Sequence, residues 1–140
     1  MSYFPDLASG PLKISIDYDG TMWSHMKFFR CFMWAMQSAG HQVGCLTGHN
    51  EECRDADILL MVDRGFPVPD FWFGRTAEYL HLNGSIYKSA VILREGIDIH
   101  FDDCDFGDPQ SLALFKQHLG DQFYRVVTVK DRQPASTQYE

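Results

Sequence analysis

The sequence predicts an α/β fold, in which a doubly wound, mostly parallel sheet of about five strands carries helices on both faces. Two observations lead to this prediction. Short apolar runs alternate with longer segments of helical periodicity along the chain. A glycine also follows each predicted helix, at Gly40, Gly65, Gly96 and Gly120. This alternation is typical of βαβ units, and ligands of such sheets bind beyond the carboxyl ends of the strands.

The first half of the chain is predicted to form two strands, each followed by a helix. Residues 12–17 are an apolar-rich run that suits a buried strand. Ser24 is a suitable N-cap for a helix over residues 24–39, whose aromatic and methionine side chains predict core packing. The second strand covers residues 41–47. Asn50 is a suitable N-cap for a second helix that runs towards Arg64.

The third and fourth strands are predicted in the second half of the chain. Residues 71–73 form a short third strand, and residues 75–87 remain open between a helical turn and a loop with a turn at Asn83-Gly84. A helix begins near Lys88 and reaches Glu95. The fourth strand covers residues 97–101, where apolar and polar residues alternate.

The last predicted elements are a helix that begins at Asp108-Pro109 and a strand over residues 123–129. Residues 1–11 are predicted to be a loose lead-in, residues 12–130 a single domain, and residues 131–140 a disordered polar tail.

Composition narrows the class of protein. A chain of 140 residues with 45% hydrophobic residues is long and apolar enough for one buried core. The formal charge of -7 argues against a nucleic-acid partner and suits a site that holds a cation and acts on a small anion. The four cysteines include no C-x-x-C pair, so we expect them to be reduced. No signal peptide or membrane-spanning run is visible, so we expect a cytoplasmic protein without a membrane partner.

Polar residues follow three of the predicted strands, which places them at one edge of the sheet. They are Asp17 and Asp19, then Thr47 and Gly48, then Asp102 and Asp103. Lys88, in the helix before the fourth strand, has a stem long enough to reach that edge. Carboxylate oxygens favour Mg²⁺ or Ca²⁺ over softer metals, and Thr21 offers a hydroxyl and an N–H to an anion. Together these groups predict phosphate chemistry.

Four segments resemble the four motifs of the haloacid dehalogenase (HAD) superfamily, most of whose members are phosphatases. Residues 14–21 (ISIDYDGT) resemble motif I, and residues 43–48 (VGCLTG) resemble motif II. Lys88 resembles the lysine of motif III, and residues 99–103 (IHFDD) resemble the acidic pair of motif IV. The likeness extends over residues 12–129, nearly the whole chain.

The resemblance implies a role for each matched residue. Asp17 would be the nucleophile that forms an aspartyl-phosphate, and Asp19 the general acid and base. Thr47 would hold phosphate oxygens, and Lys88 would offset the charge of the carboxylates. The implied Mg²⁺ ligands are the Asp17 carboxylate, the Asp19 backbone carbonyl, Asp102, and Asp103 as a ligand or a neighbour of the ligands.

The substrate is less well defined by the sequence. Only about 40 residues separate Thr47 from Lys88, so the chain resembles the members without a cap domain, whose sites are open. We expect a small phosphorylated substrate or a phosphoprotein, and a homo-oligomer would be able to cover the open site. Thr21, Gly48, Trp23 and Arg75 are the expected substrate contacts, with core packing as the equal alternative for Trp23. Asn83 and Tyr87 also lie in the segment expected to touch substrate.

Two other functions compete with a phosphatase. One is a HAD-like scaffold without turnover that serves as a binding or regulatory protein. The other is a receiver domain, which also combines acidic residues, threonine and lysine on a doubly wound sheet. A receiver carries its phosphorylated aspartate after the third strand, and the residues after 71–73 here are Gly74 and Arg75. The sequence therefore favours the phosphatase.

Overall fold

One parallel sheet forms the centre of the protein, and the computed structural model describes it within residues 10–130. Its strands are β1 (Lys13–Ile16), β2 (Gln42–Asn50), β3 (Trp72–Arg75), β4 (Ile99–Asp102) and β5 (Val126–Thr128). They lie in the order β3-β2-β1-β4-β5, and every neighbouring pair is parallel. The chain therefore runs outward from β1 to one edge and then continues from β4 to the other. This order confirms the predicted doubly wound α/β fold and places the switch point between β1 and β4.

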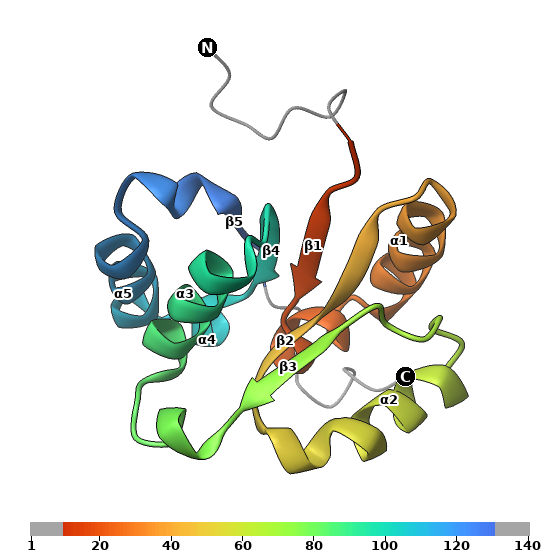
Figure 1. Cartoon of the computed structure of the whole chain (residues 1–140), viewed down its shortest axis with the longest axis horizontal. Coiled ribbons are helices and arrows are strands. Elements are labelled where there is room, and N and C mark those ends of the chain that lie inside the picture. Colours follow the sequence, from red (N-terminus) through yellow and green to blue (C-terminus); the bar gives the residue numbers. More distant parts are fainter. Residues whose placement is uncertain (1–9, 131–140) are drawn as a thin grey trace.

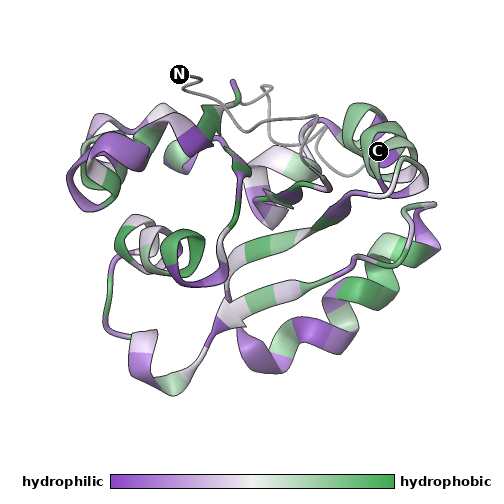
Figure 2. Cartoon of the chain, turned by 45° about the horizontal axis from the view of Figure 1, so that its top comes forward, coloured by the Kyte–Doolittle hydropathy of each residue, from purple (hydrophilic) through white to green (hydrophobic). Residues whose placement is uncertain are grey.

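Helices cover both faces of the sheet (Figure 1). The helices are α1 (Met26–Ser38), α2 (Arg54–Asp63), α3 (Gly84–Glu95), the short α4 (Cys104–Gly107) and α5 (Pro109–Leu119). Residues from α1 and α2 share one buried cluster with β1, whereas residues from α3 and α5 share a second cluster with β5. In Figure 2 the helices carry both hydrophobic and hydrophilic segments, as helices with one buried side do.

Side chains from the strands divide between the two clusters because successive residues of a strand point to opposite faces. Ile14 and Ile16 face the α1 and α2 side, where they meet Phe29 and Met33. Ser15, between them, points to the opposite face of the sheet and is fully buried, with its hydroxyl 2.7 Å from His100 Nδ1. The buried polar residue on β1 therefore marks the face on which the polar groups of the site continue.

Several predicted boundaries are corrected by the structure. The third helix begins at Gly84 and not near Lys88, because the Asn83 side chain accepts a hydrogen bond from Ser85 N–H (2.8 Å) and caps it. Residues 75–87 contain the last residue of β3, a short helical turn over Ala77–Tyr79 and the start of α3. The first helix begins at Met26, with His25 and not Ser24 at the N-cap position.

The fifth helix begins as predicted, with Asp108 accepting a hydrogen bond from Gln110 N–H (3.2 Å) and Pro109 in its first turn. The ends of the strands differ from the prediction. β2 and β3 are longer, since they continue to Asn50 and Arg75, whereas β5 has only three residues because a turn over Gly120–Arg125 precedes it. The predicted tail and most of the predicted lead-in lie outside the described residues. Within residues 10–130, each helix is too short or too polar to cross a bilayer.

Candidate functional site

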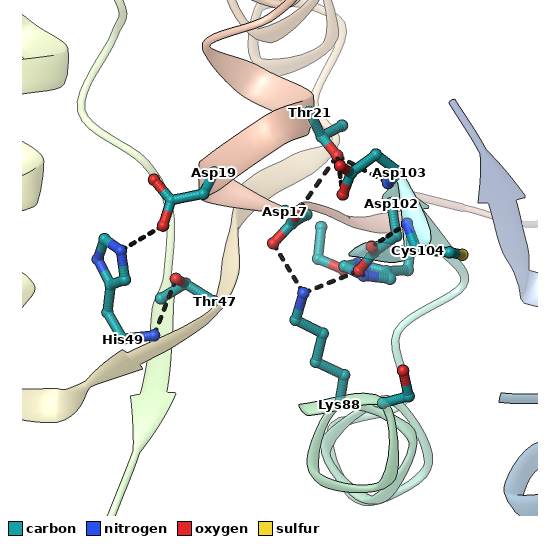
Figure 3. Close-up of polar contacts among 12 residues, drawn as sticks. Asp17, Asp19, Thr21, Thr47, His49, Lys88, Asp102, Asp103 and Cys104 are labelled. Atoms are coloured by element: carbon teal, nitrogen blue, oxygen red, sulfur yellow. Dashed lines mark hydrogen bonds and ion pairs between the residues drawn. The ribbon is translucent and has the colours of Figure 1, made fainter. Parts of the chain in front are cut away.

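Three carboxylates meet at the carboxyl ends of β1 and β4, the two strands at the switch point. Ile16 of β1 pairs with Phe101 of β4, so Asp17 follows one strand exactly where Asp102 ends the other. Carboxylate oxygens of Asp17, Asp102 and Asp103 all lie within 4.8 Å of one another, and all three residues are buried. Figure 3 shows this group. The strand order thus brings together two of the segments that the sequence had marked as acidic.

Lys88 enters the same group from α3. Its Nζ donates to Asp17 Oδ1 (2.7 Å) and to Asp102 Oδ2 (2.9 Å). Burial lowers the pKa of Lys88, but the charges of Asp102 and Asp17 outweigh it and raise that pKa above its ordinary value. The ammonium therefore stays charged. The start of α3 at Gly84 places Lys88 in the second turn of the helix, directly beneath the carboxylates.

The two carboxylates that share Lys88 differ in their proton affinity. Burial and the charge of Asp102 raise the pKa of Asp17 well above its ordinary value, against the opposing effect of Lys88. Burial also favours a proton on Asp102, but Lys88 and His100 outweigh it and hold the pKa of Asp102 below its ordinary value. Ionised Asp17 therefore needs positive charge beyond that of Lys88.

A turn after β1 holds Asp103 against Asp17. Gly20 has a φ of 71°, and a Cβ atom at this position would collide with the Asp103 carboxylate. The Thr21 hydroxyl accepts a hydrogen bond from Asp103 N–H (2.9 Å) and lies 3.2 Å from Asp17 Oδ2, to which it can donate. Thr21 is fully buried, so its hydroxyl connects the two acidic segments and does not extend into the cavity as a substrate contact would.

A buried polar chain supports Asp102 from beneath. His100 Nε2 lies 2.7 Å from Asp102 Oδ2, and His100 Nδ1 lies 2.7 Å from Ser15 Oγ. Burial lowers the pKa of His100, which favours a neutral ring. A neutral ring that donates from Nε2 to Asp102 accepts at Nδ1 from Ser15, so both nitrogens are satisfied. Cys104 N–H donates to the other carboxylate oxygen, Asp102 Oδ1 (2.8 Å).

Asp19 lies at the edge of the site and is held by a histidine. His49 Nε2 lies 2.5 Å from Asp19 Oδ2, and His49 Nδ1 lies 2.7 Å from Asp57 Oδ2. The hydrogen bond to Asp19 is the main cause that raises the pKa of His49 to about 9. The ring therefore carries a positive charge between two carboxylates, with Asp57 as its anchor on α2.

A cavity of about 310 Å³ opens over these groups. Its wall contains the residues of the acidic group, the predicted phosphate contacts and several residues that we had not predicted: Asp17, Asp19, Thr47, Gly48, His49, Arg75, Gly84, Ser85, Lys88, Asp102, Asp103, Asp105, Ser111 and Phe115. The Thr47 hydroxyl accepts from His49 N–H (3.1 Å), which leaves its own hydrogen for a ligand.

Trp23, like Thr21, does not line the cavity as the predicted substrate contacts would. Trp23 is only 1% exposed and packs edge-to-face against Tyr18 and Phe66 in the core under α1 and α2. The alternative of core packing is the one that the structure supports, because the helical turn after Gly20 directs Trp23 away from the cavity. Tyr87 is buried as well, in the cluster under α3 and α5, so its side chain also belongs to the core.

Sequence reasoning missed the residues that support the site from behind. Asp57, Ser15 and His100 were not singled out from the sequence. For His100 a signal existed, since residues two apart on a strand share a face and His100 precedes Asp102 by two. For Asp57 there was none, because its contact with His49 depends on how α2 packs against the end of β2.

The donor set fits a hard divalent cation. The three clustered carboxylates and Lys88 leave a net charge of about minus two, which a divalent cation balances. Each ionised carboxylate has more lone pairs than the hydrogen bonds described above consume, so oxygens remain for a metal. Oxygen ligands of this kind match Mg²⁺ or Ca²⁺ rather than zinc or copper. The arrangement can thus hold a cation beside a carboxylate that faces a cavity.

Comparison with known proteins returned no relative of this chain. No protein-family model, no curated protein and no solved structure matches it.

Proposed function

We propose that this protein is a Mg²⁺-dependent phosphatase that hydrolyses a phosphomonoester through an aspartyl-phosphate on Asp17. The observation that carries the proposal is the meeting of Asp17, Asp102, Asp103 and Lys88 at the floor of one cavity. Asp17 directly follows β1, Lys88 lies on α3, and Asp102 and Asp103 lie at the end of β4; in this chain order their segments resemble motifs I, III and IV of the HAD superfamily.

Mg²⁺ would be held by the carboxylates of Asp17, Asp102 and Asp103 and by the backbone carbonyl of Asp19. When bound, it supplies positive charge that lets an anionic carboxylate approach an anionic phosphoryl group. The raised pKa of Asp17 supports this requirement, because an extra cation is needed to keep the carboxylate ionised. Lys88 does not supply enough positive charge for this, because its ammonium is shared with Asp102.

In the first step, a carboxylate oxygen of Asp17 forms a bond to phosphorus and the bond between phosphorus and the leaving oxygen breaks. Asp19 gives a proton to that leaving oxygen. The contact between His49 Nε2 and Asp19 Oδ2 keeps a proton at this place, so the pair can deliver it together. Thr47, with its free hydroxyl hydrogen, is positioned to donate to a phosphoryl oxygen.

In the second step, water attacks phosphorus and the bond from phosphorus to Asp17 breaks. Asp19 takes the proton of the attacking water, so the His49–Asp19 pair returns to its starting state. Inorganic phosphate leaves, and the Asp17 carboxylate returns to its contact with Lys88. The bond between Asp17 and phosphorus that forms in the first step therefore breaks in the second, and the proton given to the leaving oxygen is replaced by one from the attacking water.

A small phosphoester suits the cavity better than a large ligand. The cavity volume of about 310 Å³ lies at the lower end of the range for small-molecule sites. The excess of acidic over basic residues, 19 against 12, disfavours nucleic acid as substrate. A phosphorylated side chain of a protein would also fit, since only the phosphoryl end needs to enter.

The test is hydrolysis of p-nitrophenyl phosphate by the purified protein with Mg²⁺ and with EDTA. We expect Mg²⁺-dependent turnover that Asp17→Asn removes and that the exposed control Asp121→Asn retains. Activity that survives Asp17→Asn would refute this mechanism. Absence of turnover by the wild-type protein across a broad panel of phosphoesters would favour the alternative of a silent HAD-like scaffold.

A further inference from the structure

One cation of the cavity wall is not used by the acidic groups. The basic side chains in this wall are Lys88, His49 and Arg75. Lys88 lies between Asp17 and Asp102, and His49 lies between Asp19 and Asp57. Arg75 forms no ion pair with a carboxylate of residues 10–130; its interactions are with a carbonyl and an aromatic ring. It is therefore the cation that remains for a ligand.

The guanidinium of Arg75 is held in place by uncharged neighbours. Its Nη1 donates to Leu82 O (2.7 Å), and its Cζ lies 5.5 Å from the centroid of the Tyr87 ring. Its Nε is buried and has no acceptor within the described part of the chain. A buried donor without a partner costs free energy, and an anionic ligand is one way to satisfy it.

The Nη2 side of Arg75 lies against two glycines of the cavity wall. A Cβ atom at Gly84 would lie 3.1 Å from Arg75 Nη2, and one at Gly48 would lie 3.6 Å from it. Both glycines line the cavity, and Gly84 begins the twelve-residue helix α3. The guanidinium thus lies beside the amino end of a helix, where the partial positive charge adds to its own.

Arg75 is displaced sideways from the acidic group. It ends β3, which is separated from β1 by β2, so the two strands lie roughly 10 Å apart at the usual strand spacing, and the register places Arg75 further along the strand direction than Asp17. Thr47, on β2, lies between them in the strand order, whereas Lys88 contacts Asp17 and Asp102 on the side of β1 and β4. An anion on Arg75 would therefore be a second group of the ligand and not the phosphoryl group on Asp17.

We infer that Arg75 and the amino end of α3 form a second anion subsite, so that the substrate carries a carboxylate or a second phosphate on its leaving group. This inference rests on the proposed phosphatase function and names the substrate class for it. Ser85 and Ser111, whose hydroxyls lie 2.6 Å apart on the same wall, supply further polar contacts for such a group.

Binding of phosphonates, which are not hydrolysed, tests the subsite without turnover. Calorimetry with Mg²⁺ compares phosphonopropionate, which has a carboxylate, ethylenediphosphonate, which has a second phosphonate, and propylphosphonate, which has neither. We expect wild-type protein to bind at least one of the two compounds with a second anionic group about tenfold or more tightly than propylphosphonate. Which one is preferred distinguishes a carboxylate from a second phosphate.

Arg75→Gln is expected to reduce this preference to less than about twofold, because the charge-assisted hydrogen bonds are lost. Arg94→Gln is the matched control, since Arg94 is an exposed arginine of α3 that pairs with Glu95. It should keep the preference. Circular dichroism of each variant checks that it is folded, and the ligand comparison in the wild-type protein needs no substitution.

Equal affinity of wild-type protein for all three compounds, or no binding of any, would overturn the subsite. So would a preference that survives Arg75→Gln, including the case where every affinity falls by the same factor, which would assign Arg75 to the reacting phosphoryl group. A preference that depends on Arg75 in a protein without phosphatase activity would support the subsite and refute the proposed hydrolysis.

Discussion

Lys88 donates from Nζ to Asp17 Oδ1 over 2.7 Å, although 71 positions separate the two residues in the chain. The same ammonium reaches Asp102, so one cation joins β1, β4 and α3 in the interior. Without it, two buried carboxylates would face each other. The contact therefore contributes to both the stability of the domain and the ionisation of the proposed nucleophile.

We predict that Lys88→Met lowers the free energy of unfolding by about 3–5 kcal/mol in EDTA, the usual cost of leaving a buried charge without its partner. Mg²⁺ should reduce this loss, because a cation bound only to the folded state stabilises it. Urea denaturation measures both values. The exposed control Lys27→Met should change stability by less than about 0.5 kcal/mol. Equal effects of the two substitutions would contradict this role of Lys88.

Gly20 is predicted to control Mg²⁺ affinity through Asp103. Gly20 and Gly40 both have positive φ, at 71° and 94°, so alanine at either position pays a similar backbone cost of about 1 kcal/mol. Only at Gly20 would the new Cβ displace the Asp103 carboxylate; no atom lies within 4 Å of a Cβ at Gly40. We expect Gly20→Ala to weaken Mg²⁺ binding about tenfold or more in calorimetry, and Gly40→Ala to leave it unchanged. Equal Mg²⁺ affinity of the two variants would be evidence against Asp103 as a ligand.

The His49 contacts predict a pH-dependent contribution to stability. The folded-state pKa of His49 is about 9, above the ordinary 6.5, so the contribution is full below pH 6.5 and is lost as the pH rises through about 9. Because the ring is half-exposed, we expect about 1 kcal/mol or less. Denaturation in EDTA at several pH values should show a gap between wild-type protein and His49→Gln that closes towards alkaline pH. The exposed His81→Gln is the matched control, and a gap that widens with pH would refute the assignment.

Asp19 is predicted to matter most when the leaving group is poor. A general acid contributes about 10²–10⁴-fold where the leaving oxygen must be protonated, and far less where it leaves as a stable anion. We therefore expect Asp19→Asn to slow hydrolysis of an alkyl phosphate much more than hydrolysis of acetyl phosphate. Steady-state kcat values for both substrates provide the measurement. Equal losses with both substrates would contradict general acid catalysis by Asp19.

The fold was predictable because its signals are local. Alternating apolar runs and the glycines after helices depend on neighbours in the chain, and the strand order then follows from a small set of allowed topologies. The end of α3 at Gly96, with its left-handed φ of 65°, is one such signal. The start of α3 was misplaced because Asn83-Gly84 is equally typical of a turn and of a helix start. Only the hydrogen bond from Ser85 N–H to the Asn83 side chain shows that a helix starts here.

The acidic group was predictable for a similar reason, since parallel strands end at one edge. The residues that hold the acidic group and Asp19 in place were not predictable, because their contacts depend on how helices pack against the sheet. The contact of His49 with Asp57 requires α2 to lie against β2, and the burial of Trp23 depends on the direction of the turn after Gly20. A strand-end residue can thus be assigned from sequence more readily than its partners on helices.

The most direct test is to trap the proposed covalent intermediate. Asp19→Asn, which should slow the attack of water, is incubated with acetyl phosphate and Mg²⁺, quenched in acid and reduced with borohydride, which converts an acyl phosphate of aspartate to homoserine. Peptide mass spectrometry then locates the change. We predict homoserine at position 17, dependent on Mg²⁺ and absent when Asp17 is also replaced by asparagine. Acetyl phosphate turnover with Asp17 unmodified, or modification at another aspartate, would contradict Asp17 as the nucleophile.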